Sequence, residues 1–264
     1  MDHRPKKCFG QNFLRDRHVV EQILTAADLQ PDDRVLEIGP GLGVLTDRML
    51  PLVREVVAIE VDRDLAAALR ERSAANLTVH EGDALSLHWE SLLPDPPYKL
   101  VANLPYNISS QILFRILDHR HCLGRLVLMF QKEVGDRLAA TPGTKDYGIL
   151  SVFCQLWFDI RRVTLVPPGA FYPPPKVTSI VLSFEPLVLP RVEIVDEEFF
   201  RRVVKAAFAQ RRKTLRNSLL GSGFAAATVD PALTSAGIDP GRRGETLTLA
   251  DFARLADAMQ SVSS

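Results

Sequence analysis

A glycine-rich turn directly after a short apolar run is the feature that most constrains how this chain folds. Arg34–Ile38 is β-branched and apolar, and it leads into Gly39–Gly43 (GPGLG) and then the helix-compatible Val44–Leu50. Glycine allows a strand to reverse into a helix and allows a ligand to approach bare backbone. The run therefore predicts a strand, a tight turn and a helix around a bound ligand.

The same alternation of apolar runs and helical stretches continues along the first half of the chain. Four more strands are predicted, at Glu55–Ile59, Leu77–His80, Leu100–Ala102 and Leu126–Phe130. A helix is predicted at Asp62–Arg72, and another near Gln111 with Ser109 and Ser110 as its caps. Strands that alternate with helices predict a parallel sheet covered by helices on both faces.

The pattern changes in the second half. Asp159–Val166 and Lys176–Phe184 are β-rich, flank a proline-rich loop and predict an antiparallel pair. After Asp196 the pattern is helical, with helices expected at Glu197–Ala209, Leu215–Leu220, Pro231–Ala236 and Leu249–Met259. We predict an α/β fold: a Rossmann-like, mostly parallel sheet with an antiparallel edge hairpin over residues 1–187, then a small all-α domain over residues 188–264.

The composition excludes several classes of protein. Lys and Arg number 32 and Asp and Glu number 32, so a local patch, and not net charge, must hold any anionic partner. Cys8, Cys122 and Cys154 are too few for a disulfide framework, and the six histidines show no metal-ligand spacing. No window approaches the roughly 20 apolar residues that cross a bilayer. We therefore expect a cytoplasmic protein without a metal site and without membrane contact.

Acidic residues follow the second and third predicted strands. Glu60 closes one strand, and Asp83 follows the next in Gly82–Ala84. Because the carboxyl ends of parallel strands meet at one crevice, both carboxylates are expected beside the glycine turn. Glu60 can accept both hydroxyls of a ribose, and Asp83 can accept an amine of a base. The turn has GxGxG spacing and no phosphate-binding features, so a nucleoside without a phosphate fits best, and S-adenosylmethionine is such a cofactor.

The fourth predicted strand ends in Asn103, Leu104, Pro105 and Tyr106. An asparagine carbonyl and a backbone carbonyl held rigid by the following proline offer two acceptors, and Tyr106 offers a flat face. This combination suits an exocyclic amine on a stacked base. Two accepted hydrogen bonds draw the nitrogen lone pair out of conjugation, so nitrogen becomes a better nucleophile without a general base.

The segment from Phe199 to Leu220 carries basic residues and no acidic ones. The basic residues are Arg201, Arg202, Lys205, Arg211, Arg212, Lys213 and Arg216. Such segregation in a neutral chain predicts a patch for an RNA backbone. N-terminal basic residues can add to it, namely Arg4, Lys6, Lys7, Arg15 and Arg17.

Ordered motifs along nearly the whole chain resemble those of the ribosomal RNA adenine dimethyltransferase family. They are Gly10–Leu14 (GQNFL), Glu37–Gly43 (EIGPGLG), Glu60 in AIEVD, Gly82–Ala84, Asn103–Ile108 (NLPYNI), Phe171–Val177 and Phe208–Leu215. They most resemble the bacterial small-subunit enzymes, which are similar in having a helical C-terminal domain of this size. The chain departs from the family at Thr178, where Asp is frequent, and at Tyr172; we expect neither residue to touch the chemistry.

The resemblance implies a class I methyltransferase that acts during small-subunit biogenesis. It would transfer methyl groups from S-adenosylmethionine to N6 of two adjacent adenosines in a 3′-terminal hairpin loop of 16S rRNA and release S-adenosylhomocysteine. It would act as a monomer on the immature 30S subunit. The implied cofactor contacts are Asn12, Leu14, Gly39, Gly41, Glu60, Asp83 and Asn103. The implied catalytic positions are Asn103, Leu104, Pro105, Tyr106 and Phe171, with Tyr106 and Phe171 stacking on the target base.

Three alternatives stay open at this point. A methyltransferase of similar design can act on 23S rRNA or on DNA adenine. A non-catalytic RNA-binding factor can retain the same fold, although it does not need Glu60 and the acceptors at Asn103. An NAD-dependent dehydrogenase requires a pyrophosphate loop and a hydride-transfer residue, and neither is evident.

Overall fold

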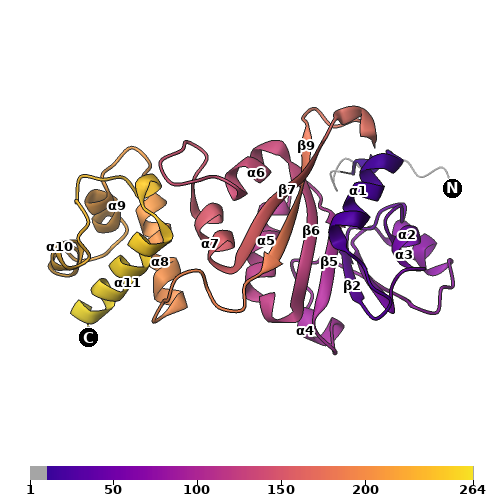
Figure 1. The fold of residues 1–264 in the computed structure, drawn as a ribbon, viewed down its shortest axis with the longest axis horizontal. Helices are drawn as coiled ribbons and strands as arrows, with labels where there is room; N and C mark the ends of the chain where they lie inside the picture. Colours follow the sequence, from indigo (N-terminus) through magenta and orange to yellow (C-terminus); the bar gives the residue numbers. More distant parts are fainter. Residues whose placement is uncertain (1–10, 264) are drawn as a thin grey trace. The chain divides into compact units, whose positions relative to one another are not determined.

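The computed structural model describes residues 11–263, drawn as a ribbon in Figure 1. They divide into two compact units. The first holds the described residues up to Gly135 together with Asp159–Pro186, and the second holds Asp136–Phe158 together with the described residues from Leu187 onward. Cys8 and the basic residues Arg4, Lys6 and Lys7 lie outside the described residues.

The first unit is built on a seven-stranded sheet in the order β4-β3-β2-β5-β6-β9-β7. The strands are β2 (Arg34–Ile38), β3 (Glu55–Glu60), β4 (Leu77–Glu81), β5 (Tyr98–Asn103), β6 (Leu123–Gln131), β7 (Phe158–Val166) and β9 (Ser179–Pro186). The first five are parallel to their neighbours, whereas β9 runs antiparallel to β6. The predicted α/β fold, mostly parallel with an antiparallel edge, is confirmed.

Strand β6 shows why this sheet forms. Its residues Leu126–Phe130 are all at most 1% exposed, as expected for a parallel strand covered on both faces. Alternate residues face opposite sides, so Val127 and Met129 join the core cluster that includes Val20 and Ile23 of α1 (Arg17–Ala27). The uninterrupted apolar run therefore specifies a central strand.

Helices connect the strands of the first unit. They are α2 (Thr46–Met49), α3 (Arg63–Arg70), α4 (Trp89–Leu92) and α5 (Ser109–Asp118). Helix α6 (Lys132–Leu138) follows β6 and contains the boundary between the two units. Asp16 and Asp62 cap α1 and α3 by accepting hydrogen bonds from backbone N–H groups in the first turn. The expected capping by Ser109 and Ser110 is wrong. The helix starts at Ser109 itself, whose hydroxyl donates to the Tyr106 carbonyl at 3.2 Å.

The second unit is helical. Its C-terminal helices are α8 (Glu197–Phe208), α9 (Leu215–Gly221), α10 (Ala226–Ser235) and α11 (Leu249–Ser263), orange to yellow in Figure 1. The inner segment 136–158, which includes α7 (Ile149–Trp157), groups with them, although we expected it in the sheet domain. Tyr147 contacts Phe208 with ring centroids 6.1 Å apart, and Gly143 N–H donates to the Glu245 carbonyl at 2.7 Å. These contacts join residues far apart in sequence, so local patterns do not reveal them.

None of the helices in the described part of the chain has the length and apolar character needed to cross a bilayer.

The packing of the second unit gives a first prediction. A Cβ at Gly244 would lie 2.5 Å from the backbone oxygen of Ala207, so Gly244→Ala forces α8 and the turn at 244–246 apart. We expect the free energy of unfolding to fall by about 1 to 3 kcal/mol in urea titrations, as overpacking usually costs. Gly148→Ala is the matched control, because its Cβ would meet nothing within 4 Å. Equal stability of the two variants would contradict this packing.

Candidate active site

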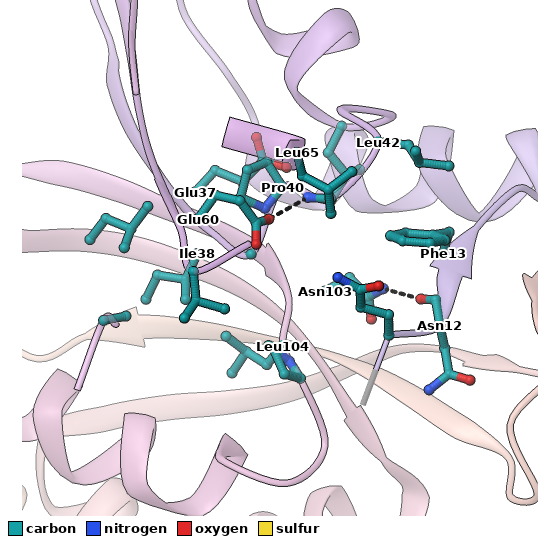
Figure 2. A pocket seen from close by; sticks show the side chains of 18 of the residues that line it. Asn12, Phe13, Glu37, Ile38, Pro40, Leu42, Glu60, Leu65, Asn103 and Leu104 are labelled. Atoms are coloured by element: carbon teal, nitrogen blue, oxygen red, sulfur yellow. Dashed lines mark hydrogen bonds between the residues drawn. The ribbon is translucent and has the colours of Figure 1, made fainter. Parts of the chain in front are cut away.

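A cavity lies at the carboxyl ends of the parallel strands β2, β3, β4 and β5. It encloses about 910 Å³, including open solvent at its mouth. One lining segment precedes α1, and each of the others lies at the end of a different strand. The segments are Gln11–Leu14, Glu37–Leu42 with Val44 and Leu45, Ile59–Val61 with Leu65, Gly82–Ala84, and Asn103–Tyr106 with Ile108. Figure 2 shows most of these side chains around the cavity. The topology therefore gathers residues that are up to 97 positions apart in the sequence.

The glycine turn forms one wall of the cavity. Gly39, Gly41 and Gly43 have φ angles of +68°, +59° and +80°, which favour glycine strongly over other residues. A Cβ at Gly41 would lie 3.0 Å from the ring of Phe13. The turn thus presents bare backbone to the cavity, as predicted from the sequence.

Arg72 fastens the turn from outside. Its guanidinium donates to the Leu42 carbonyl at 2.7 Å and pairs with Asp47 at 2.5 Å. A Cβ at Gly43 would lie 2.4 Å from the same guanidinium. This contact was not predicted, because nothing in the local sequence links position 72 to the glycine turn.

Glu60 is a buried acceptor next to the turn. One carboxylate oxygen accepts from Gly41 N–H at 3.0 Å and the other from Asp62 N–H at 2.9 Å. Burial raises the pKa of Glu60, while these two hydrogen bonds lower it. Each carboxylate oxygen has two lone pairs, so Glu60 can still accept hydroxyl groups from a ligand in the cavity.

Asp83 reaches the cavity from the loop after β4. Its Oδ1 accepts from Leu85 N–H at 2.9 Å, and the residue is exposed. The loop is held by buried Trp89, whose indole N–H donates to the Ala84 carbonyl at 3.0 Å. The structure thus brings Asp83 to the same cavity as Glu60, as the parallel topology requires.

Glu37 is a second buried carboxyl in the lining, at 2% exposure. Burial raises the pKa of Glu37 to about 8, and the nearby charges of Glu60 and Asp47 raise it as well. The Thr46 hydroxyl donates to its Oε2 at 2.6 Å and opposes this shift. Glu37 is therefore protonated at neutral pH, a property that its place in the EIGPGLG run did not reveal.

The run after β5 supplies neutral oxygen acceptors and an aromatic ring. Asn103 Nδ2 donates to the Asn12 backbone carbonyl at 3.2 Å (Figure 2), so its Oδ1 is left to accept. Leu104 and Pro105 follow in the lining. The Tyr106 hydroxyl and the buried Ser179 hydroxyl share a hydrogen bond of 2.6 Å, which fixes the ring, and burial raises the pKa of Tyr106.

Phe171 is not among the residues that line the cavity. Its side chain is 4% exposed and belongs to the core cluster with Leu14 and Val19. It is the first residue of β8 (Phe171–Tyr172), which pairs antiparallel with β1 (Phe13–Leu14). Tyr172 beside it is 49% exposed. The two aromatic residues therefore face opposite sides of this small sheet.

The basic residues predicted to bind RNA lie on or between α8 and α9 of the second unit. Some form ion pairs: Arg201 pairs at 3.2 Å with Glu197, one turn earlier on α8, and Arg216 pairs at 2.6 Å with Asp230 of α10. Others are exposed and have no ion pair within residues 11–263, namely Lys205, Arg212 and Lys213. The number of basic residues in the sequence is larger than the number without an ion pair, because acidic residues such as Asp230 pair with some of them.

Within residues 11–263, no group of three or more histidine, cysteine, aspartate or glutamate side chains is placed to hold a metal ion.

Together these features define a class of protein. A turn of bare backbone, a buried carboxyl and two neutral oxygens at the rim of a mostly parallel sheet are typical of a nucleoside-binding methyltransferase, and the GxGxG turn differs from the phosphate loop of a dinucleotide site.

Comparisons with known proteins agree with this class. The model of the family described as ribosomal RNA adenine dimethylase matches residues 2–261. The ribosomal RNA small subunit methyltransferase A of Syntrophotalea carbinolica is 68% identical over 260 residues, covering 98% of both chains. That of Geobacter metallireducens is 52% identical over 266 residues, covering 98% of this chain and 97% of its own.

Solved structures show the same similarity. A dimethyladenosine transferase from Plasmodium falciparum is 27% identical, with a TM-score of 0.82, covering 95% of this chain and 98% of that one. The 23S rRNA methyltransferase ErmE is 30% identical, with a TM-score of 0.70, covering 94% of this chain and all of that one. The chain therefore belongs to the ribosomal RNA adenine dimethylase family. The family and enzyme class expected from its motifs are confirmed.

The buried carboxyl of Glu37 gives a prediction on pH dependence. A carboxyl whose pKa is higher in the folded than in the unfolded state binds more protons when folded, so stability falls as pH rises between about 4.5 and 8. For wild type we expect a loss of about 2 kcal/mol between pH 6 and 8 from this group. Glu37→Gln removes the titrating carboxyl group. The free energy of unfolding, measured by urea titration, should therefore depend less on pH in this variant.

The exposed Glu71 provides the control. Glu71→Gln should keep the wild-type slope. A Glu37→Gln variant whose stability declines with pH as steeply as that of wild type would show that Glu37 is ionised throughout.

Proposed function

We propose that this enzyme transfers methyl groups from S-adenosylmethionine to N6 of two adjacent adenosines in a 3′-terminal hairpin loop of 16S rRNA. The observation that carries the proposal is the convergence of Glu60, the glycine turn and Asn103 on one cavity. The names of its relatives, which are small-subunit rRNA methyltransferases, favour 16S rRNA as the substrate.

The cavity fits the cofactor by its donors and acceptors. Gly39 and Gly41 leave room against the backbone that a Cβ would take, beside Pro105 and the ring of Phe13 respectively. Glu60 would bind the ribose hydroxyls and Asp83 the adenine amine. The backbone of Asn12 and Leu14 would close the site. When bound, S-adenosylmethionine supplies an electrophilic methyl group on a sulfonium sulfur.

The residues after β5 would hold the target amine. The Asn103 side-chain oxygen and the Leu104 carbonyl accept its two protons, which keeps the nitrogen lone pair directed out of the ring. Pro105 restricts the backbone at this point. Tyr106, anchored through Ser179, offers its ring to the base. No nucleophilic side chain or general base is required, because alignment and electrostatics accomplish the transfer.

The second unit would bind the RNA backbone. Lys205, Arg212 and Lys213 are exposed and carry positive charge on or after α8. Arg201, Arg202, Arg211 and Arg216 complete the proposed contact set. Their positions within one helical unit support an electrostatic contact with phosphates.

We also propose that the enzyme acts as a monomer in the cytoplasm on the immature 30S subunit, where 16S rRNA is folded and assembled, and that it requires no metal ion. The similarity to ErmE supports a second candidate substrate, 23S rRNA. Methylation assays with isotope-labelled S-adenosylmethionine on unmodified 30S particles, 23S rRNA and DNA separate these substrates. N6,N6-dimethyladenosine in 16S rRNA alone supports the proposal, and product only in 23S rRNA or DNA would refute it.

Replacement of Asn103 tests the amine acceptor. We expect Asn103→Ala to lower kcat about 100- to 1,000-fold, as loss of one preorganised hydrogen-bonding group does. RNA affinity, measured by filter binding, should stay within about twofold. Asn107→Ala is the control, because Asn107 is exposed on the same loop and does not line the cavity. Unchanged kcat in the Asn103 variant would remove this residue from the chemistry.

Replacement of Glu60 tests the ribose acceptor. Glu60→Gln replaces one carboxyl oxygen with an amide nitrogen that cannot accept a hydrogen bond, so we expect the Kd for S-adenosylmethionine to rise about 10- to 100-fold in calorimetry. Glu81 lies directly beside Glu60 in the β3–β4 register but outside the cavity lining, so Glu81→Gln is the control. If both variants bind the cofactor equally well, the ribose does not sit on Glu60.

A further inference from the structure

The sheet formed by β1 and β8 has an exposed aromatic residue, Tyr172, on the face that Phe13 occupies. Phe13 lies opposite Tyr172, and Leu14 lies opposite Phe171. Directly opposed residues point to the same face, and successive pairs alternate between faces. Leu14 and Phe171 face the core. Tyr172 therefore shares its face with Phe13, which lines the cavity beside Asn103 (Figure 2).

A guanidinium covers the ring of Tyr172. Arg15 Cζ lies 4.1 Å from the ring centroid, and Arg15 N–H donates to the Ala170 carbonyl at 2.8 Å, which fixes the backbone beside β8. Arg15 is exposed and forms no ion pair within residues 11–263. Arg17 and Lys176, which flank this pair in the sequence, are also exposed and basic. An exposed ring and an exposed guanidinium thus occur together on this sheet, with two further exposed basic residues close to them in the sequence.

Such a surface suits an unpaired nucleobase and its phosphate. Single-stranded RNA is bound by stacking of bases on aromatic rings and guanidinium planes, while cations contact the backbone. The contact between Arg15 and Tyr172 could also serve only to stabilise the fold. That role would not require the Tyr172 side chain to be half exposed to solvent.

We propose that Tyr172 and Arg15 form a stacking platform for the nucleotide next to the target adenosine. This inference rests on the proposed function, because an enzyme that modifies two adjacent adenosines must draw one base into the cavity and leave its neighbour unstacked. The platform stacks that neighbour and positions the RNA strand at the cavity mouth. We had expected Tyr172 to play no part; the pairing of β1 with β8 gives it one.

The test uses the full-length protein and a hairpin RNA with two adjacent loop adenosines, one replaced by the fluorescent analogue 2-aminopurine. Tyr172→Leu removes the ring, and Tyr172→Phe keeps it. Leu165→Ala is the control, since Leu165 is another exposed apolar residue of the same unit, at 44%. Fluorescence quenching reports stacking, and titration gives the RNA affinity.

We expect Tyr172→Leu to lose the quenching and to weaken RNA binding about fivefold to 150-fold, the range for one base–aromatic stack. Tyr172→Phe and Leu165→Ala should stay within about twofold of wild type, and Arg15→Gln should weaken binding. S-adenosylmethionine affinity and the Tm of Tyr172→Leu should match wild type.

Quenching and affinity in Tyr172→Leu equal to wild type would overturn the inference, and so would a joint loss of cofactor binding and Tm, which indicates a structural role. Methyl transfer by wild type is measured in parallel. Its absence, with quenching still dependent on Tyr172, would refute the proposed function and leave an RNA-binding platform. Its presence without Tyr172 dependence would refute the platform alone.

Discussion

The parallel pairing of β3, β2 and β5 is the constraint on which the rest of the site depends. It places the carboxyl ends of all three strands at one edge, so the residues that follow them meet. Hydrogen bonds continue past the strands: Gly39 N–H donates to the Ile59 carbonyl, and Gly82 N–H to the Glu60 carbonyl, both at 2.9 Å. The loops that carry the site are thereby tied to one another as well as to the sheet.

The chemistry of the cavity depends on the carboxyl groups that are buried at this edge of the sheet. Burial raises the pKa of both Glu60 and Glu37, but two backbone N–H groups oppose the shift at Glu60, whereas Glu37 has one hydroxyl partner and its pKa rises to about 8. The Asn103 and Leu104 oxygens at the same edge are neutral acceptors, which would suit the proposed target amine as it gains a methyl group and a positive charge.

The parts of the molecule that depend on short sequence patterns could be predicted from the sequence. The apolar stretches of β2, β3, β5 and β6 are mostly buried, whereas β4 at the edge of the sheet is only half-buried. The positive φ angles of Gly39 and Gly41 explain why glycines occur there. Glu60 and Asp83 were placed at the site through a rule about strand ends. The Asn103–Tyr106 run lies in the lining as expected.

The features that sequence reasoning missed depend on contacts between distant segments. Arg72 reaches the turn from the end of α3, and segment 136–158 packs with the C-terminal helices. Phe171 and Tyr172 are adjacent aromatics, and only the register with β1 decides which of them faces the core. Side chains alternate along a strand, so one of the two rings must face the core. A strand of two residues is too short for a periodic pattern in the sequence to show which one.

The central claim is that this edge of the sheet holds the nucleoside of S-adenosylmethionine, and isothermal titration calorimetry of the wild-type protein tests it most directly. The account predicts one bound molecule of S-adenosylmethionine per chain and displacement of that molecule by S-adenosylhomocysteine. No heat of binding with either compound would contradict it.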